Sequence, residues 1–134
     1  MIVGVGIDMV EVGGFRDQLA DPASTFAAGS FTAGELADAR SRPGQEPARH
    51  LAARWAAKEA WIKAWSGSRY GEPPVLGGID MREIEVETDG WRRPRIVLHG
   101  KVRAAAGELT AQVSLSHDGG YAAAVVVLQD VTPS

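Results

Sequence analysis

The sequence of 134 residues contains no cysteine. This absence excludes disulfide bonds and thiolate metal sites, so neither can stabilise the fold or carry out the chemistry. The sequence also lacks a long apolar run. Its apolar start, residues 1–7, has no basic region before it and reaches Asp8 too early for a signal peptide or a membrane span. We therefore predict a cytoplasmic protein that does not contact a membrane.

The chain has little excess charge, and its formal net charge of −3 at pH 7 argues against a general nucleic-acid-binding protein. The charges are unevenly spread, however. Residues 40–69 hold seven of the 14 Lys and Arg side chains but only two acids, whereas residues 8–39 hold six acids and one arginine. A polyanionic small ligand near residues 40–69 is one interpretation, and a solvated helical face is the alternative.

Composition and length predict one domain covering residues 1–134, because 45% apolar and 23% charged residues are typical of a globular chain. A domain of this size buries a modest fraction of its surface, which favours oligomer formation as a source of further burial. Glycine motifs typical of Rossmann and P-loop folds are absent in the required context, since Gly4 and Gly6 lie inside a predicted strand.

The order of predicted elements is a strand, then helices, then strands. Residues 2–7 form a strand that ends at Asp8, and a short helix weakened by Gly13-Gly14 follows. The later elements are a helix over 33–40 capped by Thr32 and Glu35, a long helix over 47–65, a loop over 66–78, a hairpin of strands 84–88 and 95–98, a helix over 100–108, and strands 110–116 and 121–128. This order predicts an α+β fold, a mainly antiparallel sheet with helices packed on one face.

Two acids on separate elements are candidates for a metal site. Asp8 ends the first predicted strand, and Glu59 lies on the long helix with Lys63 one turn further on. Two carboxylates brought together suit Mg²⁺, which prefers oxygen ligands and completes its shell with waters and substrate phosphates. The alternative makes Asp8 a turn or capping residue and Glu59 half of an i,i+4 ion pair with Lys63. Lys58 is unusual because it falls inside the apolar stripe of the helix.

His117 continues the alternation of Val113 and Leu115, so we expect it on the apolar face of its strand as a buried, hydrogen-bonded histidine. Ser116 points to the opposite face and has no nucleophile-elbow motif around it. A serine hydrolase is therefore disfavoured, and spacing alone identifies no substrate.

Four motifs give more information about function than spacing does, because they occur in the order found in one enzyme family. They are Gly6-Ile7-Asp8-Met9-Val10-Glu11, Phe31-Thr32-Ala33-Gly34-Glu35, Arg54-Trp55-Ala56-Ala57-Lys58-Glu59-Ala60 with Lys63, and Ser114-Leu115-Ser116-His117-Asp118. With these motifs the chain resembles the holo-acyl-carrier-protein synthases, which are small trimeric 4′-phosphopantetheinyl transferases. The runs 49–55 and 63–69 look most like the actinobacterial branch of that family.

The resemblance implies a role for each matching residue. Asp8 and Glu59 match the family's Mg²⁺ ligands, Lys63 matches a lysine near the phosphates, and His117 matches a histidine at the coenzyme A site. Arg54 and Lys58 are nearby basic candidates for contact with coenzyme A. The family also implies a homotrimer with active sites between neighbouring chains, to which His117 and Gly119-Gly120 would contribute across the interface.

The implied reaction moves the 4′-phosphopantetheine arm of coenzyme A to a serine of an acyl carrier protein, or of a carrier domain in a fatty acid synthase, and releases 3′,5′-ADP. As a hypothesis, Glu59 accepts the serine proton directly or through a metal-bound water. In the family, basic residues that meet the acidic carrier usually follow the first aspartate, yet here residues 12–16 contain only Arg16. The alternatives are a non-catalytic subunit that binds coenzyme A or a nucleotide, and a Mg²⁺-dependent phosphoesterase.

Overall fold

The computed structural model describes residues 1–132 and contains two antiparallel sheets. Its elements in chain order are β1 (Ile2–Glu11), α1 (Val12–Ala20), α2 (Phe26–Ser30), α3 (Ala33–Arg40), α4 (Pro47–Gly67), the 3₁₀ helix η1 (Met81–Glu83), β2 (Ile84–Thr88), β3 (Pro94–Leu98), α5 (Gly100–Ala106), β4 (Leu109–Asp118) and β5 (Tyr121–Asp130). One sheet has the strand order β1-β5-β4, and β2 pairs with β3 in a hairpin. The predicted α+β fold is confirmed.

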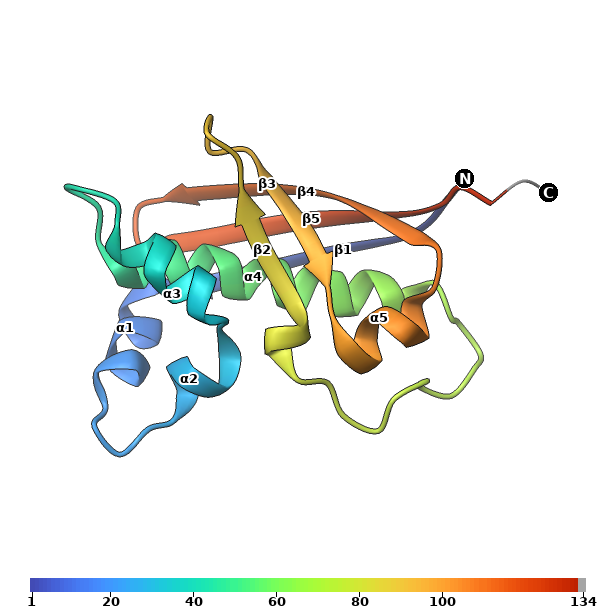
Figure 1. Ribbon diagram of the computed structural model, residues 1–134, viewed down its shortest axis with the longest axis horizontal. Coiled ribbons are helices and arrows are strands. Elements are labelled where there is room, and N and C mark those ends of the chain that lie inside the picture. Colours follow the sequence, from blue (N-terminus) through green and yellow to red (C-terminus); the bar gives the residue numbers. More distant parts are fainter. Residues whose placement is uncertain (133–134) are drawn as a thin grey trace.

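Helix α4 is the centre of the molecule. It runs along one face of the three-stranded sheet, and the β2–β3 hairpin crosses it (Figure 1). Proline suits the start of a helix because its missing N–H would lack an intrahelical partner there, and Pro47 begins α4 as predicted. A ridge of small buried residues then faces the sheet: Ala53, Ala56, Ala57, Ala60 and Ala64. Small side chains along this face let the helix approach the strands closely.

The closest approach is between α4 and β1. An added Cβ at Gly4 would lie 2.1 Å from the carbonyl oxygen of Ala64, and one at Gly6 would lie 1.9 Å from that of Ala60. Carbon atoms in ordinary contact are about 3.5–4.0 Å apart, so only glycine fits at these two positions. The backbones of strand and helix are therefore in direct contact.

The first strand is longer than predicted. Pairing with β5 continues through Asp8, opposite Ala124, to Glu11, opposite Tyr121. Asp8 therefore lies within β1 rather than at its end, and the prediction that the strand stops there is wrong. The acid is tolerated inside the strand because β1 is an edge strand and Asp8, 17% exposed, has Lys63 as a partner.

Other boundaries follow the sequence more closely. The predicted capping box of Thr32 and Glu35 is confirmed, as is the β2–β3 hairpin. Helix α1 begins at Val12 despite Gly13 and Gly14, because Val12 and Phe15 are buried against the core. The short helix α2 was not predicted.

The face of the sheet that α4 leaves uncovered carries several apolar side chains. Val5, Ile7 and Met9 of β1 are each more than 60% exposed, and Val125 of β5, which pairs with Ile7, lies on the same face. We call these four residues the outer sheet patch.

Within residues 1–132, no helix combines the length and apolar character needed to cross a membrane.

Candidate active site

Asp8, Glu59 and Lys63 meet where β1 crosses α4, and we call them the carboxylate site. The Lys63 Nζ donates hydrogen bonds to Asp8 Oδ1 at 3.0 Å and to the Ile7 carbonyl oxygen at 3.1 Å. Strand and helix therefore bring the three side chains together as predicted. Lys63 therefore pairs with Asp8 of β1, and not with Glu59 of its own helix as the alternative interpretation had it.

The charge state of Glu59 reflects this crowding. Burial raises the pKa of Glu59, the nearby Asp8 charge raises it further, and Lys63 opposes both effects. Two carboxylates that repel each other across a small space gain from a cation between them. A cation bound beside Glu59 would therefore favour its ionised form.

The chemistry of these donors fits Mg²⁺. Among residues 1–132, no cluster of three or more His, Cys, Asp or Glu side chains is arranged around a possible metal position. Two carboxylates nevertheless suffice for Mg²⁺, because this ion usually keeps several waters and takes further oxygens from a substrate phosphate. Asp8 and Glu59 are the residues that would hold it.

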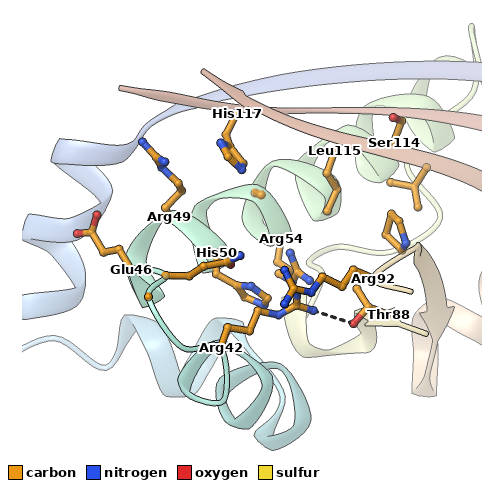
Figure 2. Close-up of a pocket in the computed structure, with 15 residues that line it drawn as sticks. Arg42, Glu46, Arg49, His50, Arg54, Thr88, Arg92, Ser114, Leu115 and His117 are labelled. Atoms are coloured by element: carbon orange, nitrogen blue, oxygen red, sulfur yellow. Dashed lines mark hydrogen bonds between the residues drawn. The ribbon is translucent and has the colours of Figure 1, made fainter. Parts of the chain in front are cut away.

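A separate cleft of about 710 Å³ opens between α4, the loop over residues 41–46, the hairpin tip and β4. Its charged and imidazole side chains are Arg42, Glu46, Arg49, His50, Arg54, Arg92 and His117. Four arginines face one acid, so we call this opening the basic cleft. Figure 2 shows Arg49 and His117 at one end and Arg42, hydrogen-bonded to Thr88, at the other.

The wall of the basic cleft contains a charge cluster around the half-buried Asp38. Its Oδ2 lies 3.2 Å from an Arg42 nitrogen, 3.2 Å from His50 Nε2 and 3.6 Å from an Arg54 nitrogen. Burial opposes ionisation of Asp38, but the hydrogen bond from Arg42 and the charges of Arg42 and Arg54 hold its pKa below the usual range. Asp38 thus offsets part of the positive charge behind the cleft.

The pKa values of His50 and Arg54 are also lowered, which for these two groups favours the uncharged form. Burial, followed by the charges of Arg54 and Arg42, lowers the pKa of His50 to about 4, so the imidazole is neutral at pH 7. Burial and then the Arg42 charge lower the pKa of Arg54 to about 10, which leaves it cationic. Within residues 1–132, the buried Nε atoms of Arg42 and Arg54 have no hydrogen-bond partner. The positive charge along the cleft favours an anionic ligand.

Two of the residues predicted to contact coenzyme A, Arg54 and His117, line this cleft together. His117 shares the face of Val113 and Leu115, as the alternation predicts. The expectation of a buried histidine is wrong, because His117 is exposed near the end of β4. Its imidazole is free to meet a ligand or a neighbouring chain.

Lys58 does not lie at the cleft, and the prediction that it contacts coenzyme A is wrong. Its side chain is fully buried, and its Nζ donates to Glu35 Oε1 at 2.8 Å, to the Met81 carbonyl at 2.8 Å and to the Ile84 carbonyl at 2.7 Å. Glu35 in turn accepts a hydrogen bond from the Val86 backbone N–H. The pair joins α3, α4 and β2, so the role of Lys58 is structural.

The carboxylate site and the basic cleft are separate within one chain. Asp8 lies on β1 and His117 on β4, the two edge strands, with β5 between them. Neighbouring strands are about 4.8 Å apart, so these backbones are separated by roughly 10 Å. Asp8, Glu59 and Lys63 do not line the cleft.

Sequence reasoning missed several residues of the cleft. The excess of arginine in residues 40–69 indicated Arg42 and Arg49 as a group but singled out neither. Arg92 and Thr88 lie on the hairpin. There the sequence showed only basic residues next to the turn at Asp89-Gly90, which does not predict a binding site. Their approach to α4 depends on how the hairpin packs, which no local pattern encodes.

Comparison with known proteins identifies the class to which this fold and site belong. A family model of the 4′-phosphopantetheinyl transferase superfamily matches residues 4–126. The chain is 52% identical over 128 residues to the holo-[acyl-carrier-protein] synthase of Mycobacterium ulcerans, covering 96% of this chain and 97% of the relative.

Solved structures agree with that match. The ACPS–CoA complex of Chronobacterium ammoniagenes superposes with a TM-score of 0.88 at 44% identity, covering 93% of this chain and 95% of that one. The holo-(acyl-carrier-protein) synthase of Bacillus anthracis, in complex with CoA (3′,5′-ADP), gives a TM-score of 0.73 at 30% identity, with 96% of each chain covered.

The chain belongs to the 4′-phosphopantetheinyl transferase superfamily. Within it, the relatives of high identity and full coverage are holo-acyl-carrier-protein synthases, so the predicted class of enzyme is confirmed.

Proposed function

We propose that this enzyme transfers the 4′-phosphopantetheine arm of coenzyme A to a serine of an acyl carrier protein or carrier domain, requires Mg²⁺, releases 3′,5′-ADP and serves fatty acid synthesis. The observation that carries the proposal is the convergence of Asp8, Glu59 and Lys63 from two elements. Two carboxylates and a lysine are the groups that transfer of a phosphate-bearing arm needs.

The basic cleft supports coenzyme A as the donor. Arg42, Arg49, Arg54 and Arg92 line it, and the 3′,5′-ADP end of coenzyme A carries several negative charges. Arginine suits phosphate because its planar donors form paired, charge-assisted hydrogen bonds. Related synthases bind coenzyme A in solved complexes.

In the reaction, the serine Oγ of the carrier bonds to the phosphorus that bears the pantetheine arm, while the bond from that phosphorus to the leaving 3′,5′-ADP oxygen breaks. A bound Mg²⁺ would supply charge neutralisation at the phosphate oxygens. Lys63, 55% exposed, lies beside Asp8 and can turn its ammonium to the same oxygens. Glu59, with its raised pKa, accepts the serine proton directly or through one water.

A homotrimer would bring the two sites together. In this arrangement one coenzyme A would be held by the carboxylate site of one chain and the basic cleft of its neighbour, since the two sites lie on opposite edges of one sheet. If each chain offers its carboxylates to one neighbour and its cleft to the other, the contacts close into a ring. The outer sheet patch supports such an assembly, because a contiguous exposed apolar face favours contact with another copy.

The trimer is tested by complementation between two impaired chains, assayed at a coenzyme A concentration well below the raised KM expected of Arg54→Met. Glu59→Gln leaves the cleft intact, and Arg54→Met leaves the carboxylates intact. Co-expressed in equal amounts, they should recover activity at roughly a quarter of sites, because random mixing pairs the two intact halves that often. No recovery in mixed oligomers verified by native mass spectrometry would place both halves of the site in one chain.

The reaction itself is tested by incubating the enzyme with coenzyme A and Mg²⁺, with and without an apo carrier protein. A mass gain of one phosphopantetheine on the carrier, abolished by a chelator, is the expected result. Release of 3′,5′-ADP without carrier would indicate the alternative phosphoesterase, and coenzyme A binding without either product would indicate a non-catalytic subunit. The cytoplasmic location and the absence of nucleic-acid and membrane partners stay predictions.

A further inference from the structure

The contact between β1 and α4 lies next to the carboxylate site. Gly6 and Asp8 face α4 from the same side of β1, about 7 Å apart along the strand. Ala60, whose carbonyl oxygen Gly6 touches, directly follows Glu59 on the helix. Of the two residues in backbone contact, Ala60 is thus next to Glu59, and Gly6 is two residues before Asp8 on the same face of the strand.

We propose that Gly6 is a positioning residue that sets the gap between the Asp8 and Glu59 carboxylates and thereby makes the site selective for a small divalent cation. This inference rests on the proposed metal role of the two acids. With a Cβ at position 6 only 1.9 Å from the Ala60 carbonyl oxygen, the helix would have to retreat. Restoring ordinary contact requires a shift of roughly 1.5 Å, and Glu59 would move with the helix.

Such a shift acts directly on the choice of metal. Mg²⁺ binds oxygen at about 2.0–2.1 Å and demands near-octahedral geometry, whereas Ca²⁺ accepts about 2.3–2.6 Å and irregular shells. A wider gap therefore penalises Mg²⁺ more than Ca²⁺. Gly4 touches Ala64 in the same way but lies farther from Asp8, so displacement there should disturb the gap less.

The test is the selectivity of Gly6→Ala for metal ions, measured on folded protein in the presence of coenzyme A. Bound Mn²⁺ is followed by electron paramagnetic resonance, and Mg²⁺ and Ca²⁺ are titrated as competitors. We expect Mg²⁺ affinity to fall up to about 100-fold, as for other misplacements of about 1 Å, with a smaller loss for Ca²⁺. The preference for Mg²⁺ over Ca²⁺ should then fall about tenfold or more.

Two further variants distinguish a changed gap between the Asp8 and Glu59 carboxylates from a general loss of stability. Gly14→Ala adds the same methyl group where an added Cβ meets nothing within 4 Å, and it should keep the wild-type metal preference. Adding Asp8→Glu to Gly6→Ala lengthens one carboxylate arm and should restore part of the Mg²⁺ affinity.

The outcomes are distinct. A folded Gly6→Ala protein with the wild-type preference, or an equal change in Gly4→Ala, would overturn the inference. If Gly6→Ala does not fold, Gly4→Ala is measured instead. The inference then requires a small but measurable fall in the preference for Mg²⁺ over Ca²⁺, and an unchanged preference overturns it. Absence of saturable Mn²⁺ binding to the wild-type protein would instead overturn the proposed metal role, and the inference with it.

Discussion

The carboxylate site and the basic cleft are built in different ways. The first joins a strand and a helix whose backbones touch at Gly4 and Gly6. The second is an open space bordered by the 41–46 loop, a hairpin tip and the end of β4. Reacting atoms must be held to a fraction of an ångström, which favours rigid elements in contact. A flexible polyanion tolerates looser walls, since charge acts over several ångströms.

The largest effect should come from removing one carboxylate of the tight site. Glu59→Gln should lower kcat by about 10²–10⁴-fold, the usual contribution of a general base, with little change in KM for coenzyme A. The measurement is steady-state transfer to a carrier protein. Glu11→Gln, at the exposed end of β1, is the matched control. Near-normal turnover of Glu59→Gln would remove Glu59 from the chemistry.

Glu59→Gln, which should lower activity, should raise thermal stability at high pH. Because the folded-state pKa of Glu59 is raised, its contribution to stability is greatest below the ordinary value of 4.5 and is lost as pH rises. Without metal, Glu59→Gln should therefore melt at a higher temperature than wild type at pH 8. This gain should vanish as pH falls below 4.5, as thermal unfolding followed by circular dichroism would show.

The wall of the basic cleft should limit stability in acid. His50 is neutral in the folded state, with its pKa lowered from 6.5 to about 4, so the unfolded chain binds the proton more tightly. Stability from this group is complete above pH 6.5 and is lost as pH falls towards 4, by about 3 kcal/mol. Urea unfolding of His50→Gln across this range should show a flatter dependence on pH. His99→Gln, on a half-exposed ring, is the control.

Arg54 should affect binding more than turnover. Arg54→Met keeps the length of the buried stem but removes the charged donors, each worth about 1.5–3 kcal/mol to a phosphate. We expect KM for coenzyme A to rise about 10–100-fold with kcat changed little. Arg103→Met, an exposed arginine on α5, should behave as wild type. A fall in kcat alone would place Arg54 at the reacting phosphate instead of in the cleft.

The smallest effect should come from Arg16, the one basic residue of α1. Its guanidinium forms an exposed ion pair with Glu46, so its charge is already partly offset. Arg16→Glu should lower the second-order rate with an acidic carrier by less than about fivefold at low salt, and by less still at 0.15 M. Stopped-flow kinetics at two ionic strengths would measure this. An unchanged rate at low salt would exclude Arg16 from steering the carrier.

The sequence predicted local structure better than contacts between segments far apart along the chain. Thr32 and Glu35 form their capping box because its pattern is contained in four residues. The hairpin and the start of α4 at Pro47 follow for the same reason. By contrast, Asp8 looked like a strand end, since an acid usually interrupts a buried strand. The pairing of β1 with β5 at the sheet edge reversed that prediction.

Two lysines on one helix show where sequence reasoning stops. Lys58 and Lys63 are five residues apart, and both were assigned to coenzyme A. The packing of η1 and β2 over α4 buries Lys58 completely, whereas β1 meets Lys63 at its exposed edge. Helical spacing placed Lys58 in the apolar stripe, but it did not show that η1 and β2 cover this position and accept hydrogen bonds from the ammonium.

The sequence by itself determined the elements, the family and the identities of the acids and lysine that meet at β1 and α4, because each is written in a local pattern or a motif. Only the tertiary structure decided that Lys58 is structural, that His117 is exposed and that the arginines of loop, helix and hairpin share one cleft. These depend on contacts between segments far apart along the chain, which arise only when the hairpin and helices pack against the sheet.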